Sequence, residues 1–143
     1  MIILTPRLIA LPLIALLASC GIPQTITPRI APASVAFAEA QRVEVVLDSF
    51  AFEPRTISLA ADRPVVLVLV NNASGGHNFS APGFFAAAQI AASDAAVITD
   101  GEVEVAPGGR VELRLIPAAG GYDLDCTHLG HSVLGMSGSI VVR

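Results

Sequence analysis

The sequence predicts an all-β fold, a Greek-key sandwich or barrel of about seven or eight strands with a short helical insertion around residues 83–98. Short segments that alternate apolar and polar residues recur from residue 41 onward, and Gly- and Pro-containing turns separate them. Residues 64–70 are instead a continuous run of β-branched residues and Leu, which is typical of a strand buried on both faces. A chain of 143 residues has the length of one domain.

The apolar N-terminus, residues 1–19, is typical of a secretion signal. Arg7 precedes an apolar run over residues 8–18. That run is too short to span a bilayer as a helix, which needs roughly 20 residues, but it suits a signal peptide. Its end, Leu17-Ala18-Ser19-Cys20-Gly21, resembles the lipobox of bacterial lipoproteins. The resemblance implies cleavage before Cys20 and acylation of its thiol; the alternative is an ordinary cleaved signal with an incidental Cys.

The lipobox implies a location in the periplasm or cell envelope, with a lipid anchor in the membrane. Gly21, rather than Asp, follows the Cys, which favours the outer membrane if the cell is Gram-negative. Residues 20–40 hold Pro23, Pro28 and Pro32 without a regular period, so we interpret them as the lipidated Cys and a flexible tether. A first edge strand within residues 35–39 is the alternative. The folded domain is predicted to span residues 41–143.

Seven strands are predicted within this domain, at residues 42–48, 56–59, 64–70, 102–105, 110–116, 122–126 and 139–142. The segment from Gly83 to Ile98 is rich in Ala, the strongest helix former, and predicts a short helix. We expect this helix to cover one end of the sandwich, with Phe84 and Phe85 as packing residues.

The charge balance bears on the partners. Eight basic residues, all Arg, stand against 12 acidic ones, which gives a formal net charge of −4. A clustered basic face is needed to grip phosphates, so we expect no nucleic-acid partner. The acidic balance could instead steer a basic protein partner toward the chain.

The residues that carry chemistry are few and lie close together. The segment 126–136 contains Cys126, His128, His131 and Met136, and His77 follows two glycines upstream. A thiolate, imidazoles and a thioether form the ligand set of a copper electron-transfer site. Zinc could accept Cys and His but gains little from Met. A lone cysteine in an oxidising compartment is also a hazard unless a ligand occupies it.

The order His77-Asn78, then Cys126, His131 and Met136, resembles the cupredoxins, the small blue copper proteins of the plastocyanin, azurin and auracyanin type. The resemblance covers roughly residues 43–143. It implies one type 1 copper ion, with His77, Cys126 and His131 in a plane and Met136 as a weak axial ligand. It also implies that Asn78 braces the ligand loops through hydrogen bonds.

His128 departs from the family pattern, because it stands two positions after Cys126, where the family has no ligand. We favour His131 as the ligand and leave His128 as a loop residue, an edge for electron transfer or a transient copper ligand.

Three hypotheses for function follow. The first is a monomeric electron-transfer protein without catalytic turnover, whose partner is a redox protein such as a cytochrome or oxidase. The second is a copper-handling, resistance or delivery module that passes copper to an acceptor. The third is a metal-free interaction domain.

Overall fold

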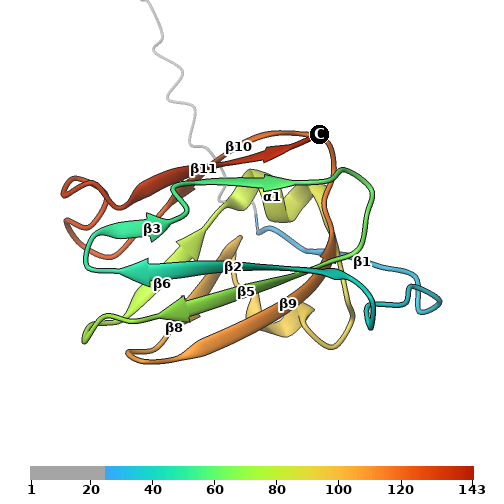
Figure 1. The fold of residues 1–143 in the computed structure, drawn as a ribbon, viewed down its shortest axis with the longest axis horizontal. Coiled ribbons are helices and arrows are strands. Elements are labelled where there is room, and N and C mark those ends of the chain that lie inside the picture. The colour runs from blue at the N-terminus through green and yellow to red at the C-terminus, as the bar shows by residue number, and fades with distance from the viewer. Residues whose placement is uncertain (1–24) are drawn as a thin grey trace, which may run out of the picture.

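Residues 25–143 are described by the computed structural model, in which two β-sheets pack face to face beside one short helix (Figure 1). The predicted signal, Cys20 and the beginning of the predicted tether lie outside the described residues. No helix in the described range is long and apolar enough to cross a membrane. The elements are β1 (Arg29–Ile30), β2 (Gln41–Asp48), β3 (Ala51–Glu53), β4 (Thr56–Leu59), β5 (Val65–Asn71), β6 (His77–Ser80), α1 (Pro82–Ala87), β7 (Gln89–Ile90), the 3-10 helix η1 (Ala95–Val97), β8 (Glu102–Val105), β9 (Arg110–Ile116), β10 (Gly120–Asp125) and β11 (Ser137–Val142).

The two sheets are mixed. One has the order β1-β7-β9-β5-β2-β3 and the other the order β4-β11-β10-β6-β8. Parallel pairing joins β2 to β5 and β4 to β11, whereas β5 with β9 and β10 with β11 are antiparallel. Both orders place strands that are distant in sequence side by side, so the all-β sandwich predicted from the sequence is confirmed.

The continuous apolar run at residues 64–70 corresponds to strand β5. It lies between β2 and β9 in the middle of its sheet, and six of its seven residues are buried. Leu67 and Leu69 point into the core between the sheets, where both are completely buried together with Phe79 and Leu113. The alternating segments, such as β8 with its buried Val103 and Val105, have one face on this core and the other toward solvent.

The predicted helix is shorter than residues 83–98. Helix α1 ends at Ala87, and β7 and η1 occupy the rest of the segment. Phe84 and Phe85 are completely buried, as expected of packing residues. Their rings contact each other and continue to Phe79 and Tyr122 through edge-to-face pairs. The helix therefore caps the core rather than offering a partner surface.

The N-terminal part of the chain joins the sheet earlier than the predicted start of the domain at residue 41. Arg29 and Ile30 form β1, which pairs in parallel with β7, and Ala31 is buried. The alternative strand predicted within residues 35–39 is wrong, since those residues form turns and irregular backbone. Two paired residues at a sheet edge are too few to create an alternating pattern, so β1 could not be predicted from the sequence.

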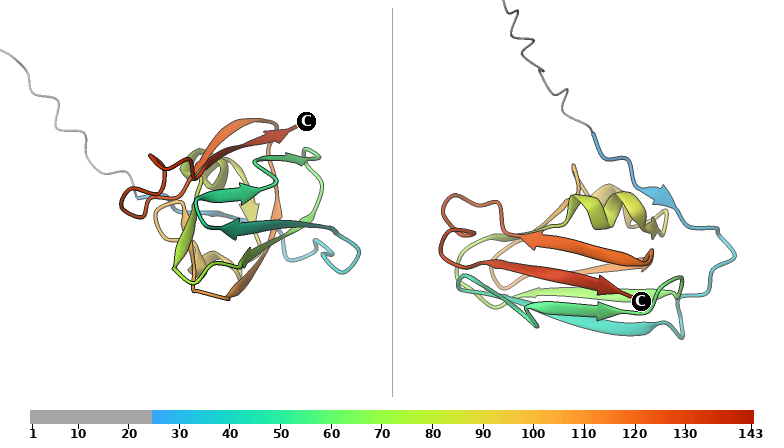
Figure 2. Two further views of the ribbon diagram at one scale, coloured as in Figure 1. Left: turned by 60° about the vertical axis from the view of Figure 1, so that its left-hand side comes forward. Right: turned by 90° about the horizontal axis from the view of Figure 1, so that it is seen from above.

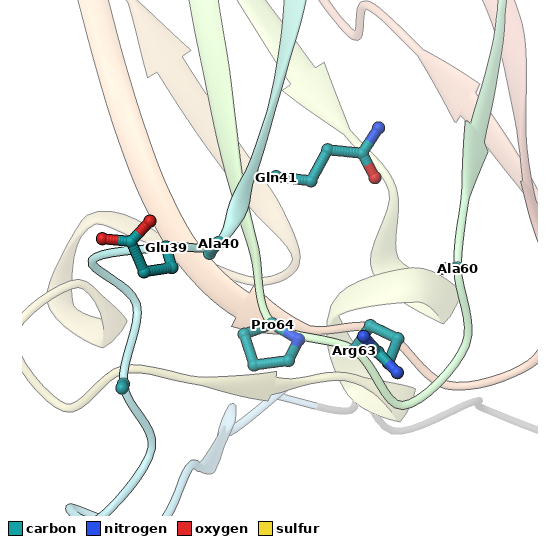
Figure 3. A pocket seen from close by; sticks show the side chains of 7 residues that line it. Glu39, Ala40, Gln41, Ala60, Arg63 and Pro64 are labelled. Carbon is teal, nitrogen blue, oxygen red and sulfur yellow. The ribbon is translucent and has the colours of Figure 1, made fainter.

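The two ends of the sandwich differ in character. At one end the loop between β10 and β11, red in Figure 1, lies beside the β2–β3 turn and the β5–β6 loop (Figures 1 and 2). At the other end a shallow hollow is lined by seven residues (Figure 3): Ala36, Glu39, Ala40, Gln41, Ala60, Arg63 and Pro64. Its lining contains neither a thiol nor an imidazole, whereas Cys126, His128 and His131 lie in the β10–β11 loop at the first end.

Candidate metal centre

Three donor atoms converge at the end of the sandwich that carries the β10–β11 loop. The Nδ1 atoms of His77 and His131 are 3.2 Å apart, and Cys126 Sγ lies 3.8 Å from His77 Nδ1 and 3.5 Å from His131 Nδ1. All three donors lie within 4.8 Å of one another. Three mutually close N and S donors of this kind fit a single metal ion placed between them.

His77 enters this cluster as the first residue of β6. The loop before it is held by Asn71, which is completely buried at the end of β5. The Asn71 side chain donates to the carbonyls of Gly75, at 2.8 Å, and Val105, at 2.9 Å, and its Oδ1 accepts from the amide of Ala73 at 2.9 Å. A fixed loop gives the His77 ring one orientation.

Burial also changes the acid–base behaviour of His77, whose side chain is hidden from solvent. Burial lowers the pKa of His77, the neighbouring His131 and His128 lower it further, and Asp48 partly opposes them. The imidazole is therefore held in the neutral form, which is the form that binds a metal ion.

Cys126 and Met136 close the two ends of one loop. Cys126 is a free thiol and both side chains are completely buried. The Cys126 amide donates to the Met136 carbonyl at 3.1 Å, and the Met136 amide donates to the His131 carbonyl at 3.0 Å. Gly130 and Gly135 have φ values of 83° and 107°, a region that favours glycine, so they allow the tight turns of the loop.

Asn78 ties this loop to β6. Its Oδ1 accepts the Thr127 amide at 2.8 Å, and its Nδ2 donates to Thr127 Oγ1 at 2.6 Å and to Glu102 Oε2 at 2.9 Å. Glu102 also accepts from Ser80 Oγ, at 2.9 Å, and from Thr127 Oγ1, at 3.1 Å. These bonds join β6, β8 and the residue after Cys126, so Asn78 links the strand that carries His77 to the loop that carries Cys126.

His128 lies outside the three-donor cluster but close to it. Its ring centroid is 6.5 Å from that of His77 and 5.5 Å from that of His131. Its Nε2 lies 3.1 and 3.2 Å from the two carboxylate oxygens of Glu104. The structure thus brings His131 to Cys126 and directs His128 toward an acidic side chain of β8.

The loop around His131 presents apolar side chains to solvent. Leu129, Val133 and Leu134 are 101%, 88% and 63% exposed, and Phe50 is 40% exposed. Phe50 meets the His131 ring edge to face, with centroids 5.1 Å apart. Exposed apolar residues that gather at one place mark an interaction surface more often than scattered ones do.

The fold and the donor set together define a small copper protein. The family model described as "Copper binding proteins, plastocyanin/azurin family" matches residues 40–143, and the chain belongs to this family. Among curated proteins no sequence matches.

Solved structures show the same fold. Auracyanin B is 24% identical with a TM-score of 0.56, covering 82% of this chain and 99% of its own. A dithionite-reduced auracyanin from Roseiflexus castenholzii is 16% identical with a TM-score of 0.55, covering 73% of this chain and 98% of its own. The McoA multicopper oxidase of Aquifex aeolicus is 18% identical with a TM-score of 0.57, but the match covers 80% of this chain and 31% of the oxidase.

The family and the donor chemistry agree on the cofactor, which is one type 1 copper ion. Thiolate and thioether sulfur suit Cu(I), imidazole suits Cu(II), and the combination serves both redox states. Sequence reasoning missed Asn71, Phe50, Glu102 and Glu104, whose roles depend on contacts between distant strands. The one available signal was the Asn at the end of the β5 run, a polar residue where an apolar strand stops.

Proposed function

We propose that this chain is an electron-transfer protein that holds its copper ion through His77, Cys126, His131 and Met136. The proximity of His77 Nδ1, Cys126 Sγ and His131 Nδ1 is the observation that carries the proposal. Met136 joins the set because its side chain is buried and its backbone bonds to Cys126 and His131. Bound copper supplies a one-electron couple between Cu(I) and Cu(II).

The chain's own residues keep the donors in one arrangement in both redox states. Asn71 fixes the loop before His77, and Asn78 fixes the residue after Cys126. His77, Cys126 and Met136 are closed to water. A rigid, closed site needs little reorganisation when an electron arrives or leaves, and it leaves no position for a substrate, so we propose no catalytic turnover.

The exposed end of the site is where we expect a partner protein to bind. His131 is partly exposed, and Leu129, Val133 and Leu134 surround it on the same loop. We propose that a redox protein such as a cytochrome or oxidase docks on this apolar loop and exchanges electrons through the His131 ring. The acidic balance of the chain favours a basic partner.

The proposed location is the cell envelope. It rests on the lipobox-like sequence at Cys20, with a tether that leads to β1. Mass spectrometry of the chain isolated from membranes is expected to give an acylated N-terminal Cys20. A mature N-terminus without lipid would contradict the anchor.

The ligand assignment is tested by substitution. Copper(II) added to the purified chain is expected to give an intense blue colour, which Cys126→Ser abolishes because no thiolate remains. His131→Gln is expected to lose the blue site, and His128→Gln to retain it. The reverse result for the two histidines would overturn the assignment of His131.

Copper delivery is a second candidate function, and the His128–Glu104 pair beside the cluster favours it. A delivery module is expected to give up its copper to an acceptor such as a metal-free copy of another copper protein. If the chain shows a reversible redox couple but transfers no copper to the acceptor, copper delivery is excluded and electron transfer is retained as the function.

A further inference from the structure

His128 and Glu104 form a pair that the four proposed ligands do not use. They come from different parts of the fold, since His128 lies in the β10–β11 loop and Glu104 lies on β8. The side chains are 33% and 66% exposed, so both can be reached by solvent. The pair also stands directly beside the cluster, with the His128 ring 6.5 Å from the His77 ring.

We propose that His128 and Glu104 form a capture site, at which Cu(II) from solution binds before it moves to the buried donors. This proposal rests on the proposed copper ligands, but it does not require that the bound copper transfers electrons. Solvent reaches this pair more easily than it reaches the buried donors. His77 is 3% exposed and Cys126 is completely buried, so a hydrated ion meets His128 and Glu104 before it meets the thiol.

The donor atoms of the pair suit Cu(II). Neutral imidazole nitrogen and carboxylate oxygen both bind Cu(II), and a carboxylate with both oxygens facing the same imidazole nitrogen offers a compact pair of donors. The pair holds no sulfur, so no thiol is present there to reduce the captured Cu(II). Two donors bind more weakly than the complete cluster, so the ion would be released inward.

The acidic residues near the pair also attract cations. Asp100, Glu102 and Glu104 line one surface hollow together with Val97 and Thr99. Acidic groups around one depression raise the local concentration of cations and speed their association. Glu104 belongs both to this hollow and to the pair with His128, so the negative charge lies next to the imidazole.

The His128 ring lies close to the rings of two proposed ligands, His77 and His131. Its centroid is 5.5 Å from that of His131 and 6.5 Å from that of His77, and the rings of His77 and His128 are tilted by only 30°. Gly76, before His77, also lies next to the His128 ring, because a Cβ there would be in ordinary contact with His128 Cε1, at 3.5 Å. These short distances favour the transfer of an ion from one imidazole to the next.

The test is the rate at which the metal-free purified chain takes up copper. Cu(II) is mixed with the chain in a stopped-flow instrument at fixed pH and ionic strength, and the blue absorption is followed at several copper concentrations. For the natural chain the rate is expected to level off at high copper, because the capture site fills. His128→Gln is expected to load about tenfold more slowly or worse, and linearly with copper, because the local enrichment of the ion is lost.

Glu104→Gln keeps the imidazole and removes one charge, so it is expected to slow loading by a smaller factor. Glu39→Gln is the matched control, since Glu39 lines the hollow at the opposite end of the sandwich and its loss changes the net charge equally. This control is expected to load at the natural rate. All three variants should reach the final blue absorbance of the natural chain.

Loading of His128→Gln and Glu104→Gln at the natural rate would overturn the proposal and leave the pair as a surface ion pair only. A weaker or shifted final band in His128→Gln would also overturn it, because His128 would then act on the final copper site. If His128→Gln does not fold, as judged by circular dichroism, the proposal is decided by comparing the copper loading rates of Glu104→Gln and Glu39→Gln. A chain that loads normally but has no reversible redox couple would contradict the proposed function and not the capture site.

Discussion

Replacing Asn71 by Ala tests how the fold directs His77 toward the other donors. The Asn71 side chain is completely buried and makes three hydrogen bonds, to the carbonyls of Gly75 and Val105 and from the amide of Ala73. The bond to Val105 is fully buried, so its loss costs the most, since no water replaces the missing donor. The other two bonds are partly buried, and water recovers part of their energy.

The expected loss in unfolding free energy is about 3 kcal/mol, of which about half comes from Val105 and the rest from the two partly buried bonds. Because the loop before His77 is then free to move, copper affinity is expected to fall by about tenfold or more. Urea denaturation of the metal-free chain and copper competition with a chelator measure the two effects.

The neighbouring Asn72 supplies the matched control, because it has the same side chain but is exposed. Asn72→Ala is expected to change the stability by less than about 0.5 kcal/mol. A loss below about 1 kcal/mol in Asn71→Ala, or an equal loss in both variants, would refute the reasoning, because the cost is assigned to burial of the bonds.

Three further outcomes are expected. Glu102→Gln removes a negative charge from the side chain that is hydrogen-bonded to Asn78, which in turn binds the Cys126 loop. Because this charge favours Cu(II), its loss should raise the reduction potential of the copper site. An unchanged potential in spectroelectrochemistry would contradict this. Because burial lowers the pKa of His77, the unfolded chain binds more protons than the folded chain as the pH falls below 6.5, so the metal-free chain should become less stable there. His77→Gln should lose less stability over the same pH range. If the urea midpoints of the two chains change equally with pH, His77 is not the cause. Val133→Asp places like charges at the contact of two molecules and should lower electron self-exchange by about tenfold or more, with unchanged stability; NMR line broadening measures the rate, and an unaltered rate would separate Val133 from the docking surface.

The sequence predicted the strands that carry their own pattern. The run at residues 64–70 lies in the middle of a sheet as β5, and the alternating residues 102–105 form β8. Strand β6 was missed, because its buried residues include His77, Asn78 and Ser80, whose polarity hides the strand. Those polar groups are tolerated since they pair with Glu102 and the ligand loop, contacts that arise only after folding.

The donor cluster was predictable for a similar reason. Cys126, His131 and Met136 lie close together in the sequence on one loop, and the fold brings Cys126 and His131 together with His77 from β6. The supporting residues were not predictable, because Asn71, Glu102 and Glu104 act across strands that pair only in the folded chain. The local motif therefore carries Cys126 and His131, whereas the topology of the sheets brings His77 and the supporting residues to them.

Voltammetry of the copper-loaded chain, with its visible spectrum recorded at each potential, tests the central claim most directly. One copper ion per chain is expected, with an intense blue band that disappears on reduction and returns fully on oxidation through a single one-electron couple. A colourless copper complex, or a blue complex without a reversible couple, would contradict an electron-transfer site built from His77, Cys126, His131 and Met136.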